Sequence, residues 1–197
     1  MKKLKTKDIV TVALLSALYM ILYMVMGSVA SFFGPFGHAI SPGFCAILAG
    51  TVFFFMSRKV GRFGQFMVMQ AIVMIIFAIM GVGYLPWIIT SMLGALGADL
   101  VASREKEPAV WKVAVASGLF HVGQAFGSII PACFFLDSYI NDWVARGASV
   151  EEMESRASAM TGVMGILATV AVFAISAIGV YIGYFILRKH FEKKKTL

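Results

Sequence analysis

Three polar side chains that could bind a ligand lie inside one long apolar stretch of this sequence. His121 and Gln124 are three residues apart, and Ser128 follows one helical turn later. In a helix these side chains lie near one face, and polar groups deep in an apolar segment should face the interior of a helix bundle. They can form hydrogen bonds between helices or contact a ligand, and the sequence leaves both roles open.

Two further ionisable side chains lie near the ends of apolar stretches. Asp99 is within one turn of such an end, where we expect it to be solvated or paired with Arg104. His38 lies between two elements of glycine and proline, which predict a rigid loop over residues 34–42. In that loop His38 would be solvated or would contact a solute.

Several classes of chemistry have no signature here. The sequence contains no Gly-x-x-x-x-Gly-Lys-Ser/Thr, no His-Glu-x-x-His and no pair of closely spaced cysteines. We therefore expect no P-loop ATPase, no metal site, no catalytic residues and no enzyme activity. Cys45 and Cys133 lie in apolar stretches, and we expect both to be small buried side chains.

The amino-acid composition indicates that most side chains are surrounded by the lipid bilayer and not by water. Of the 197 residues, 60% are hydrophobic and 14% are charged, and the mean hydropathy is +0.87. A soluble domain has about 25% charged residues, and a membrane span needs about 20 mostly apolar residues. The chain is therefore predicted to be an all-α integral membrane protein, a bundle of about six transmembrane helices in one domain over residues 1–197. The predicted spans are residues 9–33, 39–56, 64–80, 87–102, 110–135 and 162–187.

The basic residues predict the orientation of these spans. All but Arg146 and Arg156 of the 17 lysines and arginines fall in the two tails or in the second-to-third and fourth-to-fifth connections. In a six-span chain these regions share one side, which the positive-inside rule places in the cytoplasm together with both termini. The net charge of +7 therefore indicates membrane orientation and not nucleic-acid binding.

The connections on the opposite side differ in chemistry. The second contains two aromatic residues, Tyr84 and Trp87, and the third, over residues 136–161, is acidic. Within the third, Ser149 and Glu152 have the spacing of a capping box, which predicts a short surface helix over residues 150–160.

Small residues spaced four apart mark surfaces where helices can approach closely. Ala13 and Ala17 in the first span form such a pair, which would contact a partner or pack inside the chain. The pairs Gly94/Ala98 and Gly123/Gly127 have the same spacing, and we expect them to pack helices within the bundle.

Several stretches resemble a known family. Thr11-Val-Ala-Leu-Leu-Ser-Ala17 is similar to the first helix of substrate-binding S components of energy-coupling-factor (ECF) transporters, with its Ala-x-x-x-Ala face. The stretches at residues 37–42, 50–64 and 187–193 resemble the MptD-like, or Trep_Strep, group of such components, and the likeness covers nearly the whole chain. The tail after Phe191 departs from the expected pattern.

The resemblance implies a six-helix protein of the bacterial plasma membrane that binds a micronutrient from outside. It also implies docking through Ala13 and Ala17 onto a transmembrane coupling protein that two ATPases drive. The ligand would lie near the outer side, under the first outer loop. The residues in that zone are His38, Tyr84, Trp87, Gln124, Ser128, Tyr139 and Trp143.

Haem is one candidate cargo, as a transported ligand and not as a cofactor. Phe32, Phe33 and Phe36 would give apolar walls, His38 could ligate the iron, and Arg146 or Arg156 could pair with propionates. A water-soluble vitamin or precursor is the alternative cargo. A stand-alone secondary transporter and an intramembrane enzyme are the alternative classes of function, and both have few candidate residues in the spans.

Overall fold

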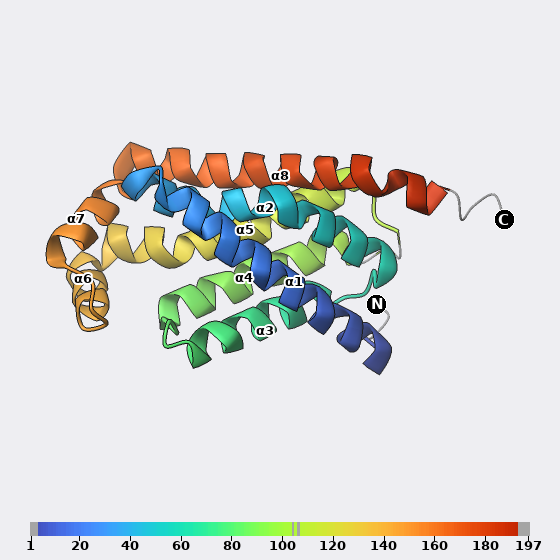
Figure 1. Cartoon of the computed structure of the whole chain (residues 1–197), viewed down its shortest axis with the longest axis horizontal. Helices are drawn as coiled ribbons and strands as arrows, with labels where there is room; N and C mark the ends of the chain where they lie inside the picture. Colours follow the sequence, from blue (N-terminus) through green and yellow to red (C-terminus); the bar gives the residue numbers. More distant parts are fainter. Residues whose placement is uncertain (1–3, 104, 106, 193–197) are drawn as a thin grey trace.

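The computed structural model describes residues 4–103, 105 and 107–192, and Figure 1 shows their arrangement. These residues form helices and, within the described part of the chain, no strand. The helices are α1 (Thr6–Ser31), α2 (Gly34–Lys59), α3 (Gln65–Ile79), α4 (Leu85–Ala102), α5 (Val110–Phe134), α6 (Leu136–Val144), α7 (Val150–Ser158) and α8 (Gly162–Glu192).

The membrane class predicted from composition is confirmed. Five helices, α1, α2, α4, α5 and α8, are long and apolar enough to cross a bilayer. The sixth predicted span corresponds to α3, which is apolar but has only 15 residues. The predicted span bounds differ from the helix bounds by up to five residues, at the start of α2 and the end of α8. The count of six crossings stays a prediction.

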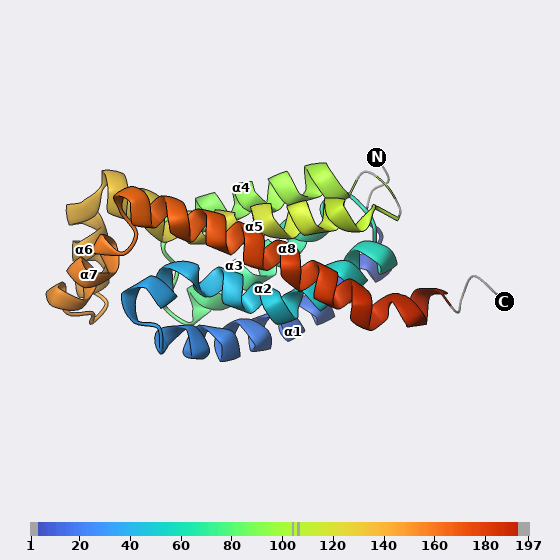
Figure 2. The same cartoon turned by 90° about the horizontal axis from the view of Figure 1, so that it is seen from above.

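The two ends of the bundle carry different elements, as Figures 1 and 2 show. The short helices α6 and α7 lie at one end, and the start of α1 and the end of α8 lie at the other. The α2–α3 and α4–α5 connections are also at this second end, so the described basic segments share one side. We call this second end the basic end and the opposite end the α6–α7 end. The cytoplasmic location of the basic end stays a prediction.

Glycine allows two helix pairs to pack backbone against backbone. A Cβ added at Gly94 of α4 would stand 2.8 Å from the Cα of Gly123 in α5, and one added at Gly50 of α2 would stand 2.1 Å from the carbonyl carbon of Gly179 in α8. No side chain fits in so short a distance. The prediction that Gly94 and Gly123 pack helices within the bundle is confirmed, and α2·α8 and α4·α5 are the most extensive helix contacts.

Asp99 has a different role from the expected one. Its carboxylate is fully buried and accepts hydrogen bonds from the backbone N–H groups of Phe66 (3.3 Å) and Met67 (3.0 Å), at the start of α3, and from the Ser103 hydroxyl (2.7 Å). It thereby satisfies unpaired donors of a helix N-terminus, where negative charge is favourable. The expectation of a solvated Asp99 is wrong, and Arg104 lies outside the described residues.

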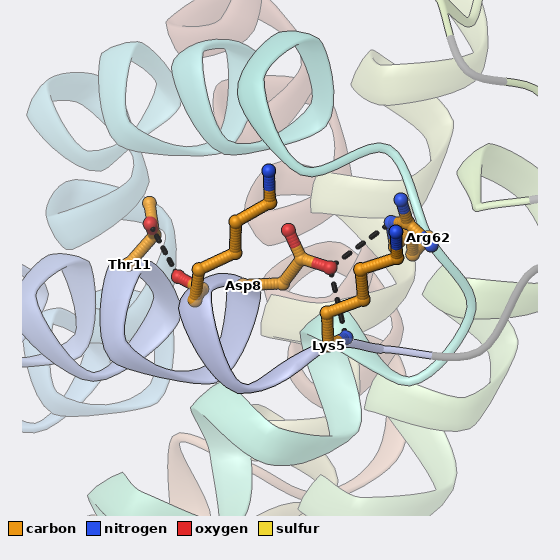
Figure 3. Close-up of polar contacts among 5 residues, drawn as sticks. Lys5, Asp8, Thr11 and Arg62 are labelled. Carbon is orange, nitrogen blue, oxygen red and sulfur yellow. Dashed lines mark hydrogen bonds and ion pairs between the residues drawn. The ribbon is translucent and has the colours of Figure 1, made fainter.

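A second carboxylate is paired at the same end of the bundle. Asp8, in the first turn of α1, accepts a hydrogen bond from the Lys5 backbone N–H (2.9 Å) and forms an ion pair with Arg62 (3.0 Å), as Figure 3 shows. Arg62 belongs to the α2–α3 connection. The pair therefore fixes the start of α1 against that connection.

The region predicted to be the first outer loop is helical, and this is a correction. After a turn at Phe32 and Phe33, α2 begins at Gly34, whose φ of +64° favours glycine, and a proline follows in the first turn. Pro42 lies inside the helix and cannot donate to the carbonyl of His38. The Ser41 hydroxyl donates to that carbonyl instead (2.9 Å), so the helix continues and His38 is held on it.

The expected burial of the two cysteines is confirmed for one of them, and the expected surface helix is confirmed. Cys45 is buried, as predicted, but Cys133 is exposed on α5, so its predicted burial is wrong. The surface helix expected over residues 150–160 is confirmed as α7, where the Ser149 hydroxyl accepts a hydrogen bond from the Glu152 N–H (3.1 Å). The helix α6 was not expected.

Candidate ligand-binding site

An inner cavity of about 190 Å³ is lined by residues of the α6–α7 end of the bundle, among them Trp143 of α6 and Tyr84 of the α3–α4 connection. Its walls come from α1, α2, α3, α4, α5 and α6 and from the α3–α4 connection. Six of the seven residues expected around a ligand line it: His38, Tyr84, Trp87, Gln124, Ser128 and Trp143. The structure therefore brings together residues that are far apart in the sequence.

The seventh expected residue, Tyr139, stands behind this wall. Its ring centroid lies 6.1 Å from that of Tyr84, and its side chain interacts with Ser128. Tyr139 is buried and does not line the cavity. It supports the position of two lining residues from the α6 side.

An outer cavity of about 430 Å³ adjoins the inner one. The two share Tyr23, His38 and Ser41 as lining residues, so His38 lies at the junction between them. The outer cavity also contacts Glu152 and Arg156 of α7, which form an ion pair with each other. Arg156 thus already has an anionic partner next to the cavity.

Aromatic rings form much of the inner wall. Phe77 packs between two of them, with ring centroids 4.9 Å from Trp87 and 5.4 Å from Tyr23. The ring of Trp143 lies 6.0 Å from that of Tyr84. Flat apolar faces arranged in this way suit a flat apolar ligand group, because ring pairs prefer offset or edge-on contacts at such separations.

Arg146 attaches α6 to the body of the protein. Its guanidinium donates to the carbonyls of Gly81 (3.1 Å) and Gly83 (3.0 Å) in the α3–α4 connection and lies over the Trp143 ring at 5.6 Å. Gly81 has a φ of +81° and closes α3, with the Val82 N–H donating back to Phe77. Arg146 therefore positions the wall that Trp143 contributes, and two of its five N–H donors bond to these carbonyls.

Beneath the inner cavity, three polar side chains form a buried chain of hydrogen bonds across three helices. The Tyr19 hydroxyl donates to the amide oxygen of Gln124 (3.2 Å), and the Gln124 amide nitrogen donates to Gln70 (3.0 Å). Tyr19, Tyr23 and Gln70 were not singled out in the sequence. A glutamine within a short apolar segment was the signal that could have indicated Gln70.

His121 lies deeper and lines neither of these cavities. It is fully buried among the rings of Tyr19, Phe53 and Phe120, and its Nδ1 is 2.8 Å from the Ser117 carbonyl of its own helix. Its Nε2 has no hydrogen-bond partner among the residues that the structure describes. The structure therefore separates His121 from the group of residues around the cavity.

The hydroxyl of Tyr84 stays protonated at neutral pH. Burial, and then the nearby Asp142 carboxylate, raise the pKa of Tyr84 to about 12. It can therefore act as a hydrogen-bond donor at the cavity wall. Among the described residues, no group of three His, Cys, Asp or Glu side chains is placed to hold a metal ion.

Comparison with known families supports the membrane assignment. A family described as hypothetical bacterial integral membrane protein (Trep_Strep) matches residues 6–193. The chain belongs to the Trep_Strep family. No curated protein and no solved structure matches it. The membrane location predicted from composition and the bacterial origin implied by the resemblance are thereby confirmed.

The first helix of this Trep_Strep protein presents an apolar face away from the bundle. Ala13 is half-buried and Ala17 is exposed. The surrounding large exposed side chains on α1 are Ile9, Val10, Leu14, Leu18, Ile21, Met24 and Val25. Lipid or a second membrane protein can contact this face, and the two alanines leave room on it for a close approach.

Proposed function

We propose that this Trep_Strep protein is the substrate-binding S component of an ECF-type importer in the bacterial membrane. The observation that carries the proposal is the pair of adjoining cavities near the α6–α7 end, where aromatic and hydrogen-bonding side chains from seven helices converge. Binding sites of membrane proteins are built in this way, from side chains on facing helices. In this proposal no residue has a catalytic role.

The packing below the cavities favours a binding protein over a channel. Tyr19, Phe53, Phe66 and Phe120 are fully buried beneath the inner cavity, and Gln124 and Gln70 are bonded to each other there. These side chains fill the interior of the bundle toward the basic end. A ligand that enters from the α6–α7 end is therefore held, and its release to the cytoplasm needs a further movement of the protein.

That movement needs an energy source, and the sequence has no P-loop. We propose that a transmembrane coupling protein and two ATPases supply it, and that the coupling protein docks on Ala13 and Ala17 of α1. Both alanines lie on an accessible apolar face, which supports this assignment. A large side chain at either position would hold the two helices apart.

The test is to purify the tagged chain from cells that also contain the coupling protein and both ATPases. We expect all three to copurify with the parent chain and to be lost with Ala17→Trp. The matched control is Ile178→Trp, which places the same indole on an exposed apolar position of α8. A parent chain that purifies alone, or equal complex formation by the two tryptophan variants, would contradict the proposal.

Haem is a candidate cargo in this scheme, because His38 offers an imidazole at the junction of the two cavities. The arginines expected to meet its propionates are occupied, Arg146 by backbone carbonyls and Arg156 by Glu152. Titration of the purified protein with haemin decides the question. A Soret shift that disappears in His38→Ala supports haem, and no shift in the parent protein removes it in favour of a vitamin or precursor.

A stand-alone secondary transporter has less support. Ion coupling needs an ionisable group below the cavities, near the middle of the membrane, that the transport pathway can reach. Asp99 is fully buried and bonded to the start of α3, and His121 lines neither cavity. Uptake that continues in cells lacking the coupling protein and the ATPases would favour this alternative over the S component.

A further inference from the structure

The two adjoining cavities differ in charge. Among the described residues, the inner cavity has no Asp, Glu, Lys or Arg in its lining, whereas the outer cavity contacts the Glu152–Arg156 ion pair. A charged ligand group in the inner cavity would lose its hydration with no opposite charge to replace it, which costs several kcal/mol. The inner cavity therefore disfavours a charged group of a ligand, whereas the outer cavity can accept one.

The inner wall also has a hydrogen-bond donor without a partner. The indole Nε1 of Trp143 is buried and has no hydrogen-bond partner among the described residues, and the Trp143 side chain lines the inner cavity. A buried N–H without an acceptor costs about 1–3 kcal/mol, so an acceptor on a bound ligand would recover part of this cost. Tyr84 on the same wall has a protonated hydroxyl that can donate as well.

The shape and size of the inner cavity limit what fits there. Its walls include the aromatic rings of Phe77, Trp87, Tyr23 and Trp143, and its volume is about 190 Å³. Pockets for whole drug-sized ligands have about 300–1,000 Å³. The inner cavity therefore holds one flat group of a ligand, and the rest of the ligand extends past His38 into the outer cavity of about 430 Å³.

Resting on the proposed binding function, we propose a ligand class for this site. The inner cavity binds an uncharged, flat, nitrogen- or oxygen-containing aromatic group, which accepts a hydrogen bond from the Trp143 indole N–H. The polar or charged part of the same ligand lies in the outer cavity beside Glu152 and Arg156.

Two probes that share one ring system test this ligand class. Quinoxaline is flat, uncharged and has two nitrogen acceptors, and quinoxaline-2-carboxylate adds one negative charge to the same rings. Each is titrated into the purified chain, without coupling protein or ATPases, and binding is followed by calorimetry and by saturation-transfer NMR. We expect quinoxaline to bind and the carboxylate to bind at least about tenfold more weakly, because a carboxylate attached directly to the rings stays with them in the inner cavity, which does not compensate its charge.

Substitutions in the cavity wall test whether the Trp143 indole N–H donates a hydrogen bond to the ligand. Trp143→Phe keeps an aromatic ring and removes the N–H, and we expect it to weaken quinoxaline binding about fivefold, the usual effect of one neutral hydrogen bond. The matched control is Trp111→Phe, an exposed position at the start of α5 that lines neither cavity, where we expect no change. Tyr84→Phe is a second variant that removes a donor hydroxyl with little change in shape, and we expect a weakening in the same direction.

Three results would overturn the ligand class: no quinoxaline binding by the parent chain, equal binding of the two probes, or equal effects of Trp143→Phe and Trp111→Phe. These results concern the cavity alone. The copurification test of the proposed function uses α1 and does not involve the cavity, so the two proposals can fail separately.

Discussion

The two ends of this bundle use acidic residues in opposite ways. At the basic end, Asp8 and Asp99 are buried and hold helix starts in place through an arginine and backbone N–H groups. At the α6–α7 end the acids are exposed on two short helices: Asp137, Asp142, Glu151, Glu152 and Glu154. The interior of that end contains uncharged aromatic side chains and two cavities.

The difference supports an inference about which end of the bundle is rigid and which end admits a ligand. A buried carboxylate that accepts several hydrogen bonds allows only one arrangement of its partners, because each lost bond leaves a buried polar group unsatisfied. Among the described polar contacts, α6 is attached to the α3–α4 connection by Arg146 on two carbonyls. We infer that the basic end is rigid and that the α6–α7 end opens.

The largest expected effect is the difference in cysteine labelling between the two ends of the bundle, which tests which end faces outward. We expect Ser149→Cys, in a chain with Cys45→Ala and Cys133→Ser, to react completely with an impermeant thiol reagent in intact cells. Ser149 is exposed at the start of α7. The matched site is Ser57→Cys near the end of α2, which should react only after denaturation because Ser57 is buried. Labelling of position 149 that requires permeabilised cells would invert the orientation.

Removing the buried acid at the basic end should cause the largest loss of stability. Asp99→Ala deletes the acceptor of three hydrogen bonds, and we expect a loss of about 3 kcal/mol in the free energy of unfolding. Thermal unfolding of the detergent-solubilised chain, followed by a thiol-reactive dye on buried Cys45 in a Cys133→Ser background, measures it. Asp137→Ala, at an exposed acid of α6, is the control and should have a far smaller effect.

Breaking the ion pair in Figure 3 should cost less. Arg62→Gln removes the partner of Asp8, and because both side chains are largely buried we expect a loss of about 1 kcal/mol. The same thermal assay, repeated at high salt, measures it. Lys112→Gln breaks an exposed pair with Glu105 and should change stability by less than about 0.5 kcal/mol. Equal shifts for the two variants would show that burial of the Asp8–Arg62 pair adds nothing.

The smallest effect on stability is expected for Arg146. Arg146→Gln releases α6 from Gly81 and Gly83, but its side chain is exposed, so global stability should change by less than about 1 kcal/mol. Amide exchange in α6 should become faster, because the helix is attached more weakly. Hydrogen-exchange mass spectrometry measures this, with Arg156→Gln as the control. Unchanged protection of α6 would contradict the inference that the α6–α7 end is the end that opens.

Local patterns were sufficient to predict the spans. A run of apolar residues determines whether a segment enters a membrane, and this property needs no knowledge of neighbours in space. The hydroxyl at Ser149 and the acid at Glu152 likewise predicted α7 from four consecutive residues. Helix α6 was missed because Leu136 to Val144 is polar on one side and short, which resembles a loop in sequence.

The errors concern residues whose roles depend on distant partners. Asp99 caps α3, which begins more than thirty residues earlier, and nothing near Asp99 in sequence indicates that contact. His38 was predicted to lie in a loop because Gly34 and Pro42 are residues that usually interrupt helices. In the structure the Ser41 hydroxyl donates to the His38 carbonyl, which Pro42 cannot do, and the helix continues. The cavity residues were grouped through a family resemblance. Their convergence from separate spans follows from helix packing, which residue spacing alone does not give.

The shortness of α3 has a consequence for the surrounding lipid. Its 15 residues extend about 22 Å, whereas the hydrocarbon core of a bilayer is about 30 Å thick. The 27 residues of α8 from Gly162 to Arg188 extend about 40 Å. A bilayer that α3 crosses, as the sequence predicts, would have to thin beside α3 while α8 tilts to fit, and each ångström of mismatch costs a fraction of a kcal/mol. In such a membrane the lipid would be thinner on the α3 side than on the α8 side, and the tilt of the protein would depend on the length of the lipid acyl chains.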